Sequence, residues 1–118
     1  MKATPAEIRR ALYPRSKYGA KRHNGYASKR EANVAAQLQA LQRAGQIHDL
    51  REQVRYEVLP KQIGHIRHEK ALSYVADFVW LDKADIEHVA DAKGVRTRLY
   101  ILKRALMKFR FGIEVEEF

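Results

Sequence analysis

The stretch YVADFVWLDKADIEHVADAKG, residues 74–94, decides the fold. Its apolar residues fall into two short blocks, 74–81 and 86–92, with a charged segment between them. Two such blocks around a polar turn are typical of two neighbouring strands. We therefore predict a strand, a turn and a second strand.

Three charged side chains stand out on these predicted strands. Strand side chains alternate between faces, so Asp91 and Lys93, two residues apart, point the same way. If the two blocks pair as a hairpin, Asp77 lies beside them on that face. Burying two carboxylates and an ammonium group among apolar residues is costly unless something compensates. A divalent cation would hold the carboxylates, and a phosphate would meet the lysine.

A helix is predicted before the strands, over residues 28–44, because apolar residues recur there at helical spacing and Gly45 ends the run. Ser28-x-x-Glu31 at its start matches a capping box, in which Glu31 reaches back to the Ser28 amide. Alternatively, the first turn faces the carboxylate site and Glu31 acts there. We favour a role at the site, and the two interpretations are compatible.

The remaining elements follow from periodicity. Residues 54–59 predict a strand, after an extended link over 47–50, and residues 60–70 predict a polar loop. A second helix is expected from Val95 or Thr97 to Phe109. Its expected buried stripe is Leu99, Leu102, Leu106 and Phe109, and its expected polar face holds Thr97, Tyr100, Lys103 and Arg104. A last strand near the end of the chain completes an α/β protein with a small mixed sheet.

A longer ordered set of residues carries a family resemblance. The set is Ser28-x-x-Glu31, Gly45-x-Ile47-x-x-Leu50-x-x-Gln53, Tyr74-x-x-Asp77-Phe78, Asp91-x-Lys93-Gly94, then Thr97, Tyr100 and Lys103. It resembles the PD-(D/E)xK nuclease superfamily and, within it, a phage-encoded family of small nucleases, formerly of unknown function, that includes Holliday-junction resolvases. Asp77 matches the first acid and Asp91-Ala92-Lys93 the (D/E)xK element, whereas Ala76 replaces the proline of the superfamily's name.

The resemblance implies a restriction-endonuclease-like αβββαβ core and an Mg²⁺-dependent endodeoxyribonuclease, with Mn²⁺ expected to substitute. By this likeness Asp77, Asp91, the Ala92 carbonyl and Glu31 bind metal, with Glu31 serving a second ion or its water. Lys93 orients the attacking water and steadies the phosphate. The catalytic set implied by the resemblance is Glu31, Asp77, Asp91 and Lys93.

The net charge of +9 is concentrated in the first 30 residues, which hold nine of the 23 Lys and Arg and one acid. Such a segment suits a polyanion, because each neutralised phosphate releases counterions; the alternative is a solvated basic tail. We expect residues 1–27 to form a basic arm, with a short helix starting at Thr4, ahead of a nuclease domain over 28–118. The expected nucleic-acid contacts are Arg15, Lys17, Lys21, Arg22, Lys29, Arg30, Thr97, Tyr100 and Lys103.

Composition bounds the remaining possibilities. The chain has no cysteine, which excludes disulfides and thiolate zinc sites, and no apolar run of membrane-spanning length. We expect a cytoplasmic protein, in the host cell if phage-encoded, with no membrane partner. The expected partners are DNA, branched by the resemblance, and a second copy, because a four-way junction presents two equivalent strands. The alternatives are a non-catalytic nucleic-acid-binding protein, or a nuclease acting on forks, flaps or linear duplex.

Overall fold

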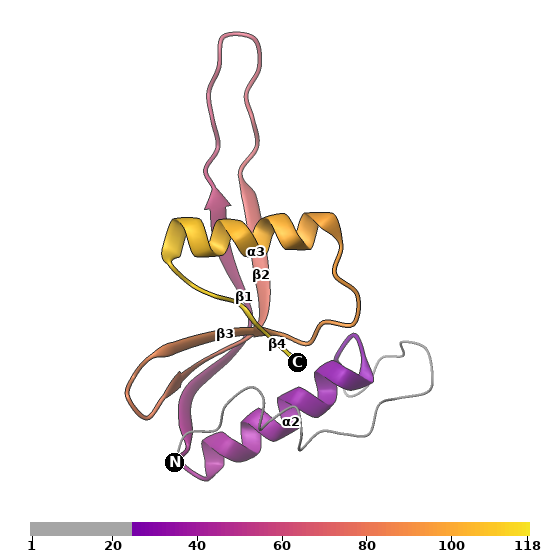
Figure 1. The fold of residues 1–118 in the computed structure, drawn as a ribbon, viewed down its shortest axis with the longest axis vertical. Helices are drawn as coiled ribbons and strands as arrows, with labels where there is room; N and C mark the ends of the chain where they lie inside the picture. The colour runs from indigo at the N-terminus through magenta and orange to yellow at the C-terminus, as the bar shows by residue number, and fades with distance from the viewer. Residues whose placement is uncertain (1–24) are drawn as a thin grey trace.

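The computed structural model describes residues 25–118, which form a four-stranded mixed sheet with two helices (Figure 1). In chain order the elements are α2 (Lys29–Arg43), β1 (Ile47–Leu59), β2 (Leu72–Asp82), β3 (Glu87–Asp91), α3 (Arg98–Phe111) and β4 (Glu116–Glu117). The sheet order is β1-β2-β3-β4, and only the β3–β4 pair is parallel. The predicted α/β class and element order are confirmed. The short helix expected at Thr4 lies outside the described residues. No helix within 25–118 is long and apolar enough to cross a membrane.

The centre of β2 is buried on both faces. Phe78 and Val79 are adjacent and both fully buried, so they point to opposite faces of the sheet. Phe78 lies opposite Ala90 in a core that includes the buried face of α2, and Val79 lies opposite Val89 in a core that includes α3. The continuous apolar run of this strand is explained by its burial between the two helices.

Strand β1 is longer than its sequence pattern predicts. The ladder with β2 begins at Ile47 instead of Val54, although its register shifts between His48 and Arg51. Asp49 and Gln53 have φ angles of 54° and 53°, in the left-handed region that few non-glycine residues adopt. These two irregular positions interrupt the alternation of apolar and polar residues, which is why periodicity missed the first half of the strand.

The predicted buried stripe of α3 is wrong at three of its four positions, since only Leu106 packs partly against the core. Leu99, Leu102 and Phe109 are 54%, 51% and 88% exposed, and the helix instead buries Tyr100 and Met107 against the sheet. Tyr100, which was predicted on the polar face, therefore packs inward, and Leu99, Leu102 and Phe109 point outward.

Glu117 of β4 explains this orientation of α3. The Tyr100 hydroxyl donates to Glu117 Oε2 at 2.6 Å, and Arg104 donates to the same oxygen at 2.9 Å. Arg96 donates to Glu117 Oε1 at 2.7 Å. Although burial alone would raise it, the pKa of Glu117 is lowered, because these three donors stabilise its charged form. The hydrogen bonds to the Glu117 carboxylate thus hold Tyr100 and Arg104 of α3 against the sheet.

Residues 60–71, which include the predicted polar loop over 60–70, form a narrow extension of the β1–β2 hairpin that rises past α3 (Figure 1). Gln62 and Glu69 face each other across it, and their backbones exchange hydrogen bonds of 2.9 and 2.8 Å. Gly64 is required near the tip, because an added Cβ would lie 2.6 Å from the Arg67 carbonyl oxygen.

His88 is expected to make folding stability depend on pH near neutrality. Burial lowers its pKa, but hydrogen bonds of its ring to the Asp82 and Glu116 carboxylates, both 2.8 Å, raise the pKa above its ordinary value. A folded-state pKa above the unfolded one, about 6.5, gives stabilisation that is complete below pH 6.5 and is lost as pH rises through the folded value.

Chemical denaturation of the wild type and of His88→Gln between pH 6 and pH 9 measures this contribution. The wild type should lose free energy of unfolding with rising pH, and His88→Gln should lose much less. The control is His48→Gln, since His48 contacts Asp85 on an exposed surface; it should keep the wild-type slope. Equal slopes in all three proteins would contradict the assignment.

Candidate functional site

Asp77 and Asp91 lie side by side where β2 and β3 pair. Each carboxylate accepts a hydrogen bond from a backbone amide on or next to the other acid's strand. The Asp77 amide donates to Asp91 Oδ1 at 3.0 Å, and the Ala92 amide donates to Asp77 Oδ2 at 3.0 Å. The predicted convergence of the two carboxylates is therefore present in the structure. Two acids are held side by side by backbone contacts that the hairpin register imposes.

Asp91 is the more deeply buried of the pair, with 1% of its surface exposed. The Tyr74 hydroxyl donates to its Oδ2. Burial raises the pKa of Asp91, and the neighbouring charge of Asp77 adds to the rise, while the Tyr74 hydroxyl opposes it. Burial and the charge of Asp77 thus oppose ionisation of Asp91, whereas the nearby Lys93 ammonium favours it.

Asp77 carries a second acidic neighbour from α2. Burial raises its pKa, and the negative charge of Glu31, whose carboxyl group lies against that of Asp77, raises it further. Gln53 opposes the rise by donating to Asp77 Oδ1 at 3.3 Å. Asp77 therefore has an acidic neighbour on each side, Glu31 from α2 and Asp91 from β3.

The N-terminus of α2 shows how Glu31 reaches this place. Ser28 is the N-cap, and its hydroxyl accepts a hydrogen bond from the Glu31 amide at 3.1 Å. Capping is thus achieved by the Ser28 side chain, and the Glu31 side chain in the first turn lies toward Asp77. The Ser28 half of the predicted capping box is confirmed, whereas the Glu31 side chain is found beside Asp77.

Lys93 follows β3 and places its ammonium group beside the acids. Its Nζ lies 3.8 Å from Asp91 Oδ2 and 4.3 Å from the centre of the Tyr100 ring. The side chain keeps 29% of its surface exposed, so the ammonium remains accessible. A partly exposed cation beside buried acids can meet an anionic ligand.

Arg30 holds the backbone of this segment. Its Nη1 donates to the carbonyl oxygens of Lys93 at 2.8 Å and Phe118 at 3.2 Å. The Lys93 amide also donates to the Phe118 carbonyl, at 3.3 Å. Arg30 was predicted to contact nucleic acid; the structure shows it tying α2, the end of β3 and the last residue of the chain together.

The other predicted nucleic-acid contacts have different surroundings. Lys29 is exposed and Lys103 is partly exposed. The Thr97 hydroxyl caps α3 by accepting from the Tyr100 amide at 3.1 Å. Tyr100 is 6% exposed, so it supports Lys93 from beneath and does not face solvent. Four predicted contacts lie outside the described residues: Arg15, Lys17, Lys21 and Arg22.

Tyr74 is the site residue whose role sequence reasoning missed. It stands three residues before Asp77, and simple alternation places residues three apart on opposite faces of a strand. Its hydroxyl nevertheless reaches Asp91 on the neighbouring strand. A buried tyrosine in a strand that carries a buried acid is the signal that could have found it, because a buried hydroxyl requires a partner.

The donor set suits a hydrated hard cation better than a closed protein cage. Within residues 25–118, no three His, Cys, Asp or Glu side chains form a ready cluster around a metal position. Mg²⁺, however, keeps several waters and is commonly bound through one or two carboxylates. Asp77 and Asp91 offer two carboxylates whose oxygens retain accepting capacity beyond the bonds described. A cation there would offset the mutual repulsion of the acids.

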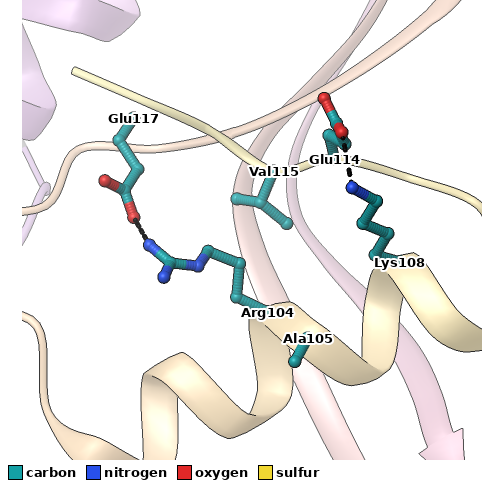
Figure 2. A pocket seen from close by; sticks show the side chains of 6 residues that line it. All are labelled: Arg104, Ala105, Lys108, Glu114, Val115 and Glu117. Carbon is teal, nitrogen blue, oxygen red and sulfur yellow. Dashed lines mark hydrogen bonds and ion pairs between the residues drawn. The ribbon is translucent and has the colours of Figure 1, made fainter.

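A shallow hollow of about 420 Å³ lies elsewhere, between α3 and the C-terminal segment (Figure 2). Its charged groups are satisfied by one another, since Arg104 pairs with Glu117 and Lys108 with Glu114, both at 2.9 Å. Neither Asp77 nor Asp91 lines it. Its chemistry is that of a stabilising ion-pair surface.

Comparison with known proteins gives one match. A family model described as a protein of unknown function, DUF1064, matches residues 15–116. The match includes all four residues of the candidate site: Glu31, Asp77, Asp91 and Lys93. No curated protein and no solved structure matches the chain.

Proposed function

We propose that this protein, which belongs to the DUF1064 family, is an Mg²⁺-dependent DNA endonuclease of the PD-(D/E)xK type. The observation that carries the proposal is the convergence of Glu31, Asp77, Asp91 and Lys93 at the β2–β3 pair. The element order α2-β1-β2-β3-α3-β4 supports a restriction-endonuclease-like core. The ordered motif in the sequence supports the same assignment.

Each side chain has a distinct part in the proposed reaction. Asp77 and Asp91 would hold Mg²⁺ together with the Ala92 carbonyl, and Glu31 would hold a second ion or its water. The bound ion supplies charge neutralisation at the scissile phosphate and an activated water. Lys93 is positioned by Tyr100 and Asp91. Its ammonium donates a hydrogen bond to a phosphate oxygen and orients the water. The expected products carry a 5′-phosphate and a 3′-hydroxyl.

A DNA-binding protein without catalysis is the alternative from a different class. Basic side chains alone serve such a protein, and carboxylates that face phosphate weaken its binding. Asp91 is buried at the site with its pKa raised, and its carboxylate has Asp77 as a near neighbour. A purely binding surface gains nothing from that cost, which favours the nuclease.

Branched DNA and a homodimer are the finer part of the proposal. Competition between a synthetic four-way junction and linear duplex of equal length, with Ca²⁺ in place of Mg²⁺ and at fixed salt, measures the preference. Sedimentation of the same samples gives the oligomeric state. We expect a dimer that prefers the junction about tenfold or more. A monomer that binds both DNAs equally would leave a general nuclease and remove the resolvase assignment.

Glu31→Gln separates a role at the site from a role in helix capping. Because the Ser28 hydroxyl already caps α2, the substitution should change the free energy of unfolding by less than about 1 kcal/mol. It should reduce cleavage about tenfold to a hundredfold, since the second ion or its water loses a charged ligand. Rates come from single-turnover cleavage and stability from urea denaturation.

Ser28→Ala is the matched control for Glu31→Gln. It removes the cap, so it should cost about 1 kcal/mol of stability and leave the cleavage rate of the folded protein near that of the wild type. Wild-type cleavage by Glu31→Gln would remove Glu31 from the active site.

A further inference from the structure

The extension of the β1–β2 hairpin, residues 60–71, stands clear of the rest of the molecule; we name it the hairpin arm (Figure 1). All of its residues are exposed. Its strands are nevertheless held together by the reciprocal Gln62–Glu69 backbone pair. A paired, fully exposed arm contributes little to the core, so its sequence is free to serve a surface role.

The tip of the hairpin arm presents two isoleucines to solvent. Ile63 is 71% exposed and Ile66 is 88% exposed, the latter among the most exposed large apolar side chains of the described residues. Gly64 lies between the two isoleucines in the sequence. It lets the chain pass close to the Arg67 carbonyl oxygen. An apolar tip on a projecting arm is the form that nucleic-acid-bending proteins use to wedge between base steps.

The charge of the arm selects the class of partner. The hairpin arm contains three basic residues, Lys61, Arg67 and Lys70, and one acid, Glu69. We call these three basic positions the stem, which is positively charged below the apolar tip. The exposed apolar face of α3 in a second copy is a poor fit, because the α3 sequence RLYILKRALMKFRF contains no acidic residue and repels the stem. A polyanion with apolar surfaces between its charges fits both the basic stem and the apolar tip.

We infer that the hairpin arm binds DNA, with Lys61, Arg67 and Lys70 on phosphates and Ile66 packed against base surfaces. The inference rests on the proposed function for the choice of DNA as substrate. Ile66 lies eleven positions before Asp77, so the tip reaches at most about 36 Å from the site. That reach equals about one turn of duplex. The arm therefore contacts DNA within about one turn of the scissile phosphate.

Ile66→Ser tests the tip against a matched control, Ile86→Ser. Ile86 is also exposed, at 54%, but lies at the β2–β3 turn. Fluorescence anisotropy with a labelled duplex of about three helical turns, in Ca²⁺, gives the affinities. We expect Ile66→Ser to bind about tenfold more weakly than the wild type and Ile86→Ser to bind normally. Equal melting temperatures of the two variants show that both fold.

The triple variant Lys61→Gln, Arg67→Gln, Lys70→Gln tests the stem. Three lost phosphate contacts should lower the slope of log affinity against log salt by about 2.7, and Lys83→Gln in the β2–β3 turn should leave it unchanged. Wild-type affinity and slope in both arm variants would overturn the inference. So would arm variants that disrupt self-association in sedimentation while binding DNA normally.

Failure of the nuclease proposal has a different signature. If the wild type does not cleave DNA but the arm variants still bind it more weakly, the arm assignment stands and the catalytic one falls. If cleavage is normal in both arm variants and binding is unaffected, the nuclease stands and the arm assignment falls.

Discussion

Asp77→Asn should reduce DNA cleavage about a thousandfold while making the protein more stable. A thousandfold loss corresponds to about 4 kcal/mol of transition-state stabilisation, a reasonable size for a lost metal ligand. The asparagine oxygen can still accept from the Ala92 amide, and the Gln53 amide can flip to accept from the new amide group. Relief of repulsion with Glu31 should then raise the free energy of unfolding by about 1 kcal/mol.

Single-turnover cleavage and urea denaturation measure the two effects of Asp77→Asn. Asp91→Asn and Lys93→Ala should show comparable losses of cleavage. Glu52→Gln is the control, because Glu52 is an exposed acid on β1 that accepts from Tyr26 and lies outside the site; it should cleave normally. Wild-type rates in any of the three site variants would remove that residue from the catalytic set.

Mg²⁺ should stabilise the protein without DNA, and Asp77→Asn should abolish the effect. Ligand at ten times its dissociation constant adds about 1.4 kcal/mol to the free energy of unfolding. For a domain of this size that corresponds to a rise in Tm of about 5 °C. The rise comes from a cation that neutralises buried, mutually repelling carboxylates.

Thermal melts with MgCl₂, CaCl₂ and NaCl at equal ionic strength separate specific binding from screening. The divalent salts should raise the Tm of the wild type more than NaCl does. For Asp77→Asn, all three salts should give the same shift in Tm. Equal shifts of the wild type with all three salts would mean that the site binds no metal.

The convergence of Asp77 and Asp91 could be predicted from the sequence because it depends on local geometry. Asp77 and Asp91 belong to one hairpin, so the two-residue period of a strand and one turn suffice to bring them together. Glu31 required one further step, the placement of a helix start, for which Ser28 gave a capping signal. The involvement of Tyr74 depends on contacts across the sheet that alternation alone does not describe.

The orientation of α3 depends on a distant residue. Leu99, Leu102 and Phe109 have the spacing of a buried stripe, yet Glu117 at the far end of the chain draws Tyr100 and Arg104 inward. Helical periodicity reports that a face is apolar and does not report which element covers it. The same limit applies to the hairpin arm, where polar composition concealed the exposure of Ile63 and Ile66.

The acids and Lys93 are proposed to form a metal-dependent phosphodiesterase site. The most direct measurement is the incubation of full-length protein with an end-labelled synthetic four-way junction, a fork and a linear duplex, in Mg²⁺, in Mn²⁺ and in EDTA. We predict cleavage of the junction in Mg²⁺ or Mn²⁺ and none in EDTA. DNA ligase should be able to rejoin the product ends, because ligation requires a 5′-phosphate and a 3′-hydroxyl. Intact substrates in both Mg²⁺ and Mn²⁺, or cleavage that persists in EDTA, would contradict the claim.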